Sequence, residues 1–434
     1  MRLLIVLLLL VATWACQTRP SASDSDMNAL ADRYVRLVLA SGQHDPDFVD
    51  AYYGPPEWKQ EAEAAGKRPL DQLREEVARL ETEIAAVPEP AGELERLRRE
   101  YLLKRTRAMG TRLRVVAGER LPFDEESSLL YDAVAPTHPE SYFEERITRL
   151  DGLVPGDGPL HARVEAFRQR FVIPRDRLEQ VFRAAIDGCR ERTAAHVALP
   201  DDERFDLEFV TDKPWSGYNW YQGGHHSLIQ VNTDLPIFID RAIDLACHEG
   251  YPGHHVYNLM YERHLVRERG WREFTVYALF SPQSLIAEGS ANFGIEIAFP
   301  GEERVTFERE RLFPLAGLDQ ADASRYYQVL EALEDLSYAG NEAARRYLDG
   351  AFTADQAVDW LVRYTLTSPE RARQRLRFID RYRSYVINYN LGKDLVRAYV
   401  EGRGGTADRP DVRWRVFTEL LSTPRLPSSL KSGT

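Results

Sequence analysis

The amino-acid sequence predicts a mainly α-helical protein: a large helical scaffold with a small β-sheet. Over most of its length, apolar residues recur at spacings of three and four, which is the period of one helix face. A segment after residue 200 instead alternates apolar and polar residues, as β-strands do. A histidine-rich stretch over residues 247–255 follows, and we expect the scaffold to bury and shape it.

The first fifteen residues have the composition of an export signal. A charged residue precedes an apolar run over residues 3–12, which is too short to cross a bilayer core that needs about 20 residues. Cys16 directly follows the small residue Ala15, which is typical of a lipoprotein acceptor. We expect a lipid-anchored protein of a bacterial periplasm or outer membrane, with a tether over residues 16–27. Plain cleavage to a soluble exported protein is the alternative.

Composition and charge exclude some classes of protein. The chain has 434 residues, of which 44% are hydrophobic and 29% charged, so it is too apolar to be disordered. Its net charge of −12, without a basic cluster, argues against nucleic-acid binding. We expect an N-terminal helical region over residues 28–200 and a C-terminal region over residues 201–434 that holds the histidines.

Regular apolar spacing predicts the helices of the N-terminal region. Apolar residues repeat at three- and four-residue steps over residues 70–84, and a pair of prolines stops the pattern. The same reasoning predicts an earlier helix that ends near Gly42. A further helix is predicted over residues 175–192, with Pro174 well placed to start it.

The pattern changes where the C-terminal region begins. Alternation over residues 205–209 predicts a strand, and an aromatic, glycine-containing turn follows over residues 215–224. A second strand is predicted over residues 227–232. Thr233 or Asp234 is expected to cap the next helix.

The histidine-rich stretch is informative because its spacing does not suit a straight helix. His248 and His254 would lie about 240° apart around an unbroken α-helix. His248 and His255 would share a face but stand about 10 Å apart along the axis, too far to bind one ion. The Pro252-Gly253 pair supplies a break, because proline lacks the N–H and glycine can take a positive φ. We expect this turn to swing His254 back toward His248.

These residues resemble a known family. The segment 248–254, HEGYPGH, resembles the HExxPGH signature of the domain-of-unknown-function 885 family, bacterial proteins regarded as zinc metallopeptidases related to the gluzincins. In that family a carboxylate follows in an E-G-W-A-L-Y-like segment, and Glu288 takes that place here. The resemblance implies a zincin-like metal helix beside the small sheet. It also implies that His248, His254 and Glu288 bind zinc and that Glu249 is the general base.

Other side chains near this stretch are candidates for supporting roles. Asp244 lies four residues before His248 and could orient that ring by accepting its second proton, although a solvent-facing carboxylate is the alternative. Glu288 has apolar neighbours, which makes its charge costly to bury unless it is paired or bound to metal. Asn292 lies four residues after Glu288, on the same helix face, and could support the metal ligands.

Substrate binding is expected next to the metal helix. In gluzincin-like peptidases an extended substrate pairs with an edge strand beside the zinc. By that resemblance, the strand over residues 228–232, which ends at Asn232, is the candidate, and a core strand is the alternative. His225 and His226 could bind substrate from the adjacent loop, or could be incidental there.

The last third of the chain offers further candidates. A capping box is predicted at Thr353, and Ser368 is expected to open a helix that runs through Tyr389. Tyr385 and Tyr389, four residues apart, could donate to the oxyanion of a tetrahedral intermediate. Arg381 could hold a substrate carboxylate bidentately. Structural packing is the alternative for each of these side chains.

Two cysteines remain besides Cys16. A disulfide between Cys189 and Cys247 is one alternative in an exported protein, but it would lie beside a metal ligand. We therefore favour two free, buried thiols.

Taken together, the sequence predicts a zinc-dependent hydrolase that cleaves peptide bonds of oligopeptides in the cell envelope. Its cofactor would be zinc and its partners a peptide substrate and, through the lipid anchor, a membrane. One alternative is a zinc-stabilised envelope binding protein without catalysis. Another is hydrolysis of a non-peptide amide or of cell-wall material.

Overall fold

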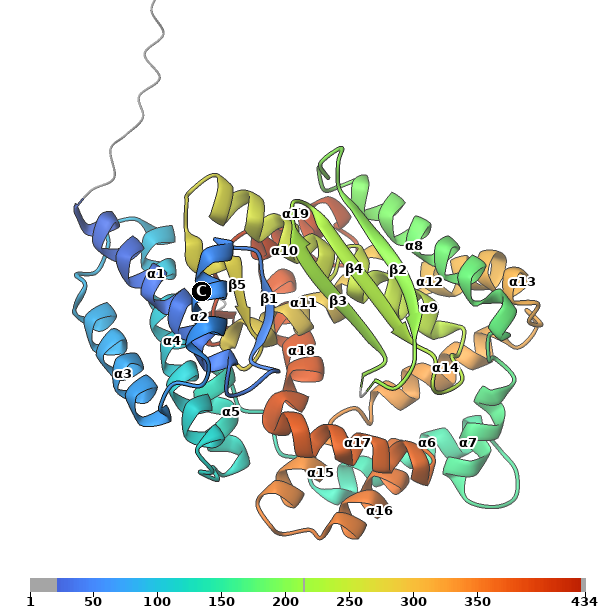
Figure 1. The fold of residues 1–434 in the computed structure, drawn as a ribbon. Coiled ribbons are helices and arrows are strands. Elements are labelled where there is room, and N and C mark those ends of the chain that lie inside the picture. Colours follow the sequence, from blue (N-terminus) through green and yellow to red (C-terminus); the bar gives the residue numbers. More distant parts are fainter. Residues whose placement is uncertain (1–21, 214, 431–434) are drawn as a thin grey trace, which may run out of the picture.

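The structure, a computed structural model, describes residues 22–213 and 215–430. It confirms the predicted fold class, because helices make up most of the chain and the strands form two small sheets (Figure 1). In the described part, no helix combines the length and the apolar composition that crossing a bilayer requires. The predicted export signal and Cys16 lie outside the described residues.

Helices of the N-terminal region follow the predicted apolar spacing. α3 (Leu70–Ala86) buries the four apolar side chains of its inner face and ends before the predicted pair of prolines. The first helix, α1 (Ala22–Gly42), ends at the predicted glycine and begins within the segment expected to be a tether. The other helical elements of this region are α2 (Pro56–Ala65), α4 (Glu93–Val116), α5 (Phe123–Tyr131), α6 (Glu140–Leu153), α7 (Leu160–Gln169), η1 (Arg175–Arg177) and α8 (Leu178–Ala194).

The C-terminal region is also helical, and two of its predicted caps are confirmed. Thr353 and Gln356 form a reciprocal capping box, and the Ser368 hydroxyl accepts from the backbone N–H of Arg371. The helical elements are α9 (Asp240–Leu245), η2 (Ala246–Gly250), α10 (His254–Tyr261), η3 (Glu262–Arg267), η4 (Arg272–Thr275), α11 (Pro282–Ala298), α12 (Glu302–Phe307), η5 (Glu308–Leu312), α13 (Phe313–Ala316), α14 (Ala323–Glu334), α15 (Ala339–Leu348), α16 (Ala354–Thr365), α17 (Pro369–Tyr382), η6 (Arg383–Val386), α18 (Ile387–Gly402), α19 (Pro410–Leu421) and α20 (Pro427–Leu430).

The main sheet has three strands in the order β2-β4-β3, and it corrects two predictions. β2 (Arg204–Val210) and β4 (His226–Asn232) are the predicted strands, and they run parallel. The aromatic segment predicted as a turn is instead a third strand, β3 (Gly217–Gly223), antiparallel to β4. Because β4 is paired on both sides, it cannot be the edge strand expected to take a substrate. A second sheet pairs β1 (Val49–Tyr52) with β5 (Val276–Ala278).

The predicted cap after β4 is wrong. No side chain caps α9, which begins only at Asp240. The Asp234 carboxylate instead accepts hydrogen bonds from the backbone N–H groups of Asp212 and Lys213, so it closes the connection between β2 and β3.

Two helices cross tightly in the middle of the molecule. α11 is buried along almost its whole length, and α18 lies against it (Figure 1). Their backbones meet at Gly289 and Gly392, where a Cβ on Gly289 would stand 2.3 Å from the backbone carbon of Gly392. Only glycine allows so close an approach. This crossing fixes the position of α11 relative to α18, and so it fixes the position of Glu288, the residue before Gly289.

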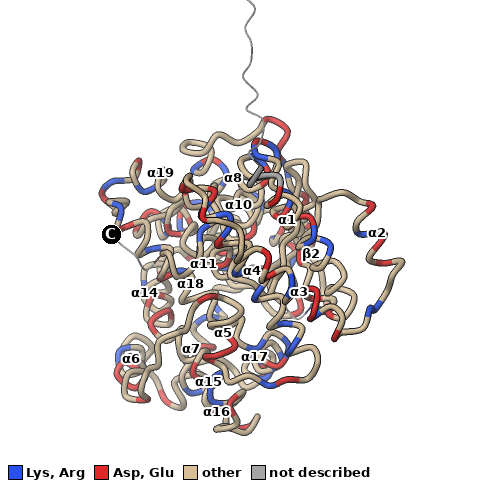
Figure 2. Tube along the Cα trace, turned by 90° about the vertical axis from the view of Figure 1, so that its left-hand side faces the viewer, with Lys and Arg blue, Asp and Glu red and all other residues tan. Residues whose placement is uncertain are grey.

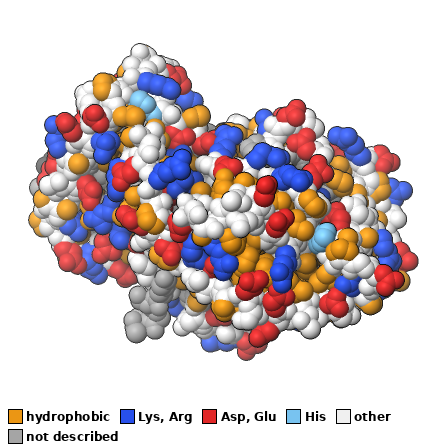
Figure 3. Space-filling model, turned by 90° about the horizontal axis from the view of Figure 1, so that it is seen from below, with side chains coloured by type: hydrophobic (Ala, Val, Ile, Leu, Met, Phe, Trp, Pro, Cys, Tyr) orange, Lys and Arg blue, Asp and Glu red, His pale blue; other side chains and the backbone are white. Residues whose placement is uncertain are grey.

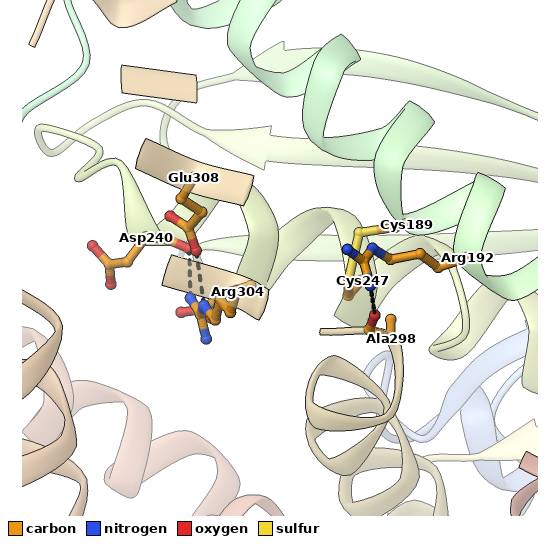
Figure 4. The surroundings of a disulfide bond; sticks show 8 residues. Cys189, Arg192, Asp240, Cys247, Ala298, Arg304 and Glu308 are labelled. Atoms are coloured by element: carbon orange, nitrogen blue, oxygen red, sulfur yellow. Dashed lines mark hydrogen bonds and ion pairs between the residues drawn. A yellow bond between two sulfur atoms is a disulfide. The ribbon is translucent and has the colours of Figure 1, made fainter. Parts of the chain in front are cut away.

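The two cysteines form a disulfide, which corrects the prediction of free thiols. Cys189 on α8 and Cys247 on η2 have Cα atoms 5.6 Å apart, within the range that a disulfide spans (Figure 4). α8 is also joined to the end of α11, because Arg192 donates to the backbone oxygen of Ala298 at 3.1 Å (Figure 4). The two cysteines are 58 positions apart, so the sequence did not predict that α8 packs against the helix that carries His248.

Removing the disulfide should lower stability. The bond joins residues 58 positions apart, and closing a loop of that length is expected to contribute about 4 kcal/mol by restricting the unfolded chain. We expect the Cys189→Ala/Cys247→Ala protein to unfold at a clearly lower urea concentration than the oxidised protein, both measured free of metal. Wild-type protein in strong reductant is the control and should approach the variant. Identical midpoints in all three samples would contradict a structural role.

Acidic and basic residues are interspersed along the chain (Figure 2), and charges of both signs are mixed on the face that Figure 3 shows. Some ion pairs are buried and join distant elements. Arg98 of α4, for example, donates to both carboxylate oxygens of Glu273 in η4, at 2.6 and 3.0 Å, with both side chains buried. These pairs hold the N-terminal helices against the C-terminal region that carries the histidines.

Candidate metal centre

The predicted break in the metal helix is confirmed. η2 is a wide helical turn that ends at Gly250, and α10 starts a new helix at His254. Between them the chain passes through Pro252, and the N–H of Gly253 donates back to the carbonyl of Cys247 at 2.9 Å. The result is a sharp bend rather than a continuous helix.

Gly253 is needed for a different reason from the predicted one. Its φ is −76°, so no positive φ is involved. A Cβ at this position would lie 1.8 Å from the backbone oxygen of His248. The bend therefore requires glycine because the two backbone segments nearly touch.

The bend brings the two histidines together with Glu288. The rings of His248 and His254 have centroids 4.6 Å apart and lie almost perpendicular, at 88°. The Glu288 carboxylate, from α11, has one oxygen 3.3 Å from Nε2 of His248 and the other 3.8 Å from Nε2 of His254. Three residues each offer one potential metal-ligand atom, and these atoms lie within 4.8 Å of one another: His248, Glu249 and His254. Four candidate residues thus share one location.

His255 points away from this location. Its side chain is fully buried, with Nδ1 2.8 Å from Oγ of Ser227 and Nε2 3.1 Å from a carboxylate oxygen of Glu203. The same Glu203 oxygen accepts a hydrogen bond from Tyr251 at 2.6 Å. Of the two adjacent histidines, His254 therefore faces Glu288 and His255 anchors the bend to the segment before β2.

Asn292, and not Asp244, contacts the second nitrogen of His248. Nδ1 of His248 lies 2.9 Å from Oδ1 of Asn292, whose amide donates to the backbone oxygen of Tyr389 at 3.0 Å. Asp244 instead pairs with Arg241 at 2.9 Å and with Arg304 at 2.7 Å, so its expected role is wrong. The physical reason is the wide turn of η2, in which residues four apart no longer share a face.

Arg304 belongs to a buried charged group beneath this helix. It donates to Glu308 at 2.7 Å and to the backbone oxygen of Asp240 at 3.2 Å (Figure 4). Asp244 thus belongs to a network that fixes α9 against α12 and η5.

Tyr385 and Tyr389 lie beside the carboxylate from α11. The hydroxyl of Tyr385 donates to Glu288 at 2.7 Å, and the rings of the two tyrosines are 5.8 Å apart. The helix predicted to carry both is interrupted, because α17 ends at Tyr382 and η6 precedes α18. Arg383, with a φ of +52°, marks the interruption.

Arg381 is not available to a substrate. Its guanidinium donates to both carboxylate oxygens of Asp47, each at 2.7 Å, which is the bidentate pairing predicted for a substrate carboxylate. The prediction is wrong because the acidic partner, 334 positions away in the sequence, could not be foreseen.

The substrate-binding candidates near β4 have structural partners. His225 lies 2.9 Å from Asp202, and His226 lies 3.0 Å from Asp206 of the neighbouring strand β2. The amide of Asn232 donates to the backbone oxygens of Lys213 and Trp215, at 3.0 and 2.9 Å. These contacts shape the loops of the sheet rather than the metal centre.

Sequence reasoning missed the strand that lies against Glu249. A Cβ on Gly217 of β3 would stand 2.8 Å from a carboxylate oxygen of Glu249, and Asn219 donates to the Glu249 backbone oxygen at 2.6 Å. A signal was present, because buried Asn219 and Tyr221 alternate with the exposed Trp220. The glycines and aromatic residues of this segment suggested a turn instead.

Burial and mutual charges shift the pKa values of the centre. Burial raises the pKa of Glu249 to about 7. Burial alone would lower the pKa of His248, but the neighbouring Glu288 and then the charge of Glu249 outweigh it and raise the pKa to about 9. Burial and the charge of His248 lower the pKa of His254 to about 4. Burial would raise the pKa of Glu288, yet its histidine and tyrosine neighbours hold it below its usual value.

The donor set fits a divalent metal ion. Two imidazoles and one carboxylate are a known ligand set for catalytic zinc, and the carboxylate lies beside both Nε2 atoms. Oε2 of Glu288 is buried and has no hydrogen-bond partner in the described part of the chain. Such an atom is expensive to leave unpaired, and a cation shared with the two rings would satisfy it.

Two solved structures resemble the chain over most of its length. A carboxypeptidase from Pyrococcus furiosus shares 15% sequence identity, with a TM-score of 0.47, over 92% of this chain and 90% of its own. The M32 carboxypeptidase from Deinococcus radiodurans R1 shares 13% identity, with a TM-score of 0.35, over 91% of this chain and 89% of its own. No family model and no curated protein matches the chain.

Proposed function

We propose that this protein is a zinc-dependent peptidase that hydrolyses peptide bonds of oligopeptides. The observation that carries the proposal is the convergence of His248, His254 and Glu288, with the carboxylate of Glu249 beside them. Two imidazoles and a carboxylate leave a zinc ion with an open position, as catalytic zinc sites require. A purely structural zinc site would use a fourth protein ligand instead.

The residues around the centre have separate tasks in this proposal. A bound zinc ion would lower the pKa of water and polarise the carbonyl of the scissile bond. Glu249 takes the proton of the attacking water and passes it to the leaving amine. Tyr385 and Tyr389, whose rings lie 5.8 Å apart beside Glu288, would donate hydrogen bonds to the oxyanion, and Asn292 would hold His248 in orientation.

β3 replaces β4 as the candidate strand for substrate pairing. Among the described strands it pairs only with β4, and it runs directly over Glu249. β1 and the residue after it contact β3 through side chains: Tyr218 donates to Asp50 of β1, and the ring of Tyr53 is 5.4 Å from that of Tyr221. An extended peptide that pairs with β3 would pass the metal centre in a fixed direction.

The disulfide supports the proposal that the protein is exported. Disulfides persist in oxidising compartments such as the bacterial periplasm and are rare in the cytosol. Together with the N-terminal sequence, the Cys189–Cys247 bond favours an envelope protein anchored through Cys16.

Metal removal tests the proposed activity. The purified protein would be loaded with zinc, stripped with a chelator or stripped and reloaded, and each sample incubated with a mixed-peptide library read by mass spectrometry. We expect cleavage in the first and third samples only. A zinc-stabilised binding protein would bind the metal and cleave nothing in any sample. Release of ammonia or of cell-wall fragments, without peptide cleavage, would favour hydrolysis of a non-peptide amide.

A further inference from the structure

We propose that the protein binds peptides that end in a free, acidic carboxyl-terminal residue, with Arg375 binding the α-carboxylate and Arg371 the side-chain carboxylate. Both arginines lie on α17, which η6 joins to α18 (Figure 1). This inference rests on the proposed peptidase activity and adds the substrate class and the direction of binding.

Arg375 is connected to the metal centre through two neighbouring tyrosine rings. Its guanidinium carbon is 5.8 Å from the ring of Tyr389 and 4.8 Å from the ring of Phe378. Tyr389 in turn stands 5.8 Å from Tyr385, which donates to Glu288. A carboxylate on Arg375 would therefore lie on the side of the metal centre that Tyr389 borders.

Arg371 lies one helical turn further from the centre, on the same face of α17. Its guanidinium carbon is 5.4 Å from the ring of Phe238, and one nitrogen donates to the backbone oxygen of Pro236 at 3.5 Å. It therefore faces the segment that joins β4 to the metal helix. Side chains four apart on a helix have Cβ atoms about 5–6 Å apart. That spacing is comparable with the separation of the two carboxylates of a terminal glutamate.

Neither arginine has an acidic ion-pair partner within residues 22–213 and 215–430. Burial lowers the pKa of both guanidinium groups, the opposite of what a carboxylate partner does for Arg381. A partly buried guanidinium without an acidic partner loses solvation of its charge, which is unfavourable. An anionic ligand would compensate for that loss. Arg241, which also borders Glu249, is already paired with Asp244.

Three blocked peptides separate the two contacts. They are N-acetyl-Ala-Ala-Glu, its carboxyl-terminal amide, and N-acetyl-Ala-Ala-Gln. Binding would be measured by calorimetry on zinc-loaded protein that carries Glu249→Gln, so that the peptides stay intact, and kcat/KM on the active protein. We expect the free glutamate peptide to be favoured about 10- to 100-fold over each of the other two, as hydrogen bonds to charged groups allow.

Variants assign each preference to one arginine. Arg375→Gln should remove the preference for free acid over amide and leave the preference for Glu over Gln. Arg371→Gln should do the reverse. Arg373→Gln, at an exposed position of the same helix, is the matched control and should change neither ratio.

The outcomes distinguish this inference from the proposed activity. Selective binding without hydrolysis of any peptide would overturn the peptidase and keep the acidic-ligand site. Two outcomes would overturn the inference and keep the peptidase, provided that library peptides are hydrolysed. One is equal affinity and equal kcat/KM for the three blocked peptides. The other is a preference among those peptides that neither Arg371→Gln nor Arg375→Gln changes.

Discussion

Glu249→Gln protein should keep its zinc and its fold while losing roughly 10²- to 10⁴-fold in kcat/KM, which is the usual contribution of a general base. Glutamine has nearly the same shape, so the side chain still fits against Gly217, and the backbone oxygen still accepts from Asn219. What disappears is the carboxylate that we propose accepts the proton of the attacking water. Peptide hydrolysis, zinc content and the circular dichroism spectrum would be measured on the same preparation.

Glu262 offers a matched control for that variant. It is a buried glutamate near the end of α10, where it accepts hydrogen bonds from Tyr221 at 2.5 Å and from the backbone N–H of Gly224 at 3.0 Å. Glu262→Gln should lower stability but change kcat/KM only slightly, because this carboxylate has its partners outside the metal centre. Full activity of Glu249→Gln would remove Glu249 from the mechanism.

The His254→Ala variant should lose its zinc, whereas the His255→Ala variant should lose stability. His254 faces Glu288, so its removal takes away a proposed metal ligand, and we expect loss of bound zinc and of activity in a protein that still folds. His255 contacts Ser227 and Glu203 in the interior, so its removal should lower the free energy of unfolding by roughly 2–4 kcal/mol while zinc is retained.

Zinc content and urea midpoints of the two variants would be compared side by side. Equal zinc in both proteins would count against His254 as a ligand. The reversed pattern, with zinc lost only from His255→Ala, would mean that the bend presents the other ring to the metal.

The bend between the two histidines was predictable because it depends on local backbone rules, whereas the candidate ligand set was what the family resemblance implied. A proline and a glycine between two histidines require a break, and that break is present. Caps at Thr353 and Ser368 and the apolar face of α3 were predictable for the same reason, since each is fixed by residues three or four apart.

Predictions failed where distant partners decide the outcome. Arg381 is engaged by Asp47, Asp244 by Arg304, and Cys189 by Cys247, and none of these pairs leaves a signal in the local sequence. β3 was missed although its alternation was visible, because its glycine content resembles that of a turn. Its position over Glu249 depends on the tertiary fold.

The crossing of α11 and α18 has a consequence for how the protein acquires its metal. Glu288 is held in place by a tyrosine from a segment nearly a hundred positions later, and its position depends on two glycines in contact. A chain without η6 and α18 still has His248, His254 and Glu288, but it lacks the tyrosine and the glycine contact that hold Glu288 in place. If the centre binds zinc as proposed, tight binding is coupled to the last steps of folding, when η6 and α18 pack against α11.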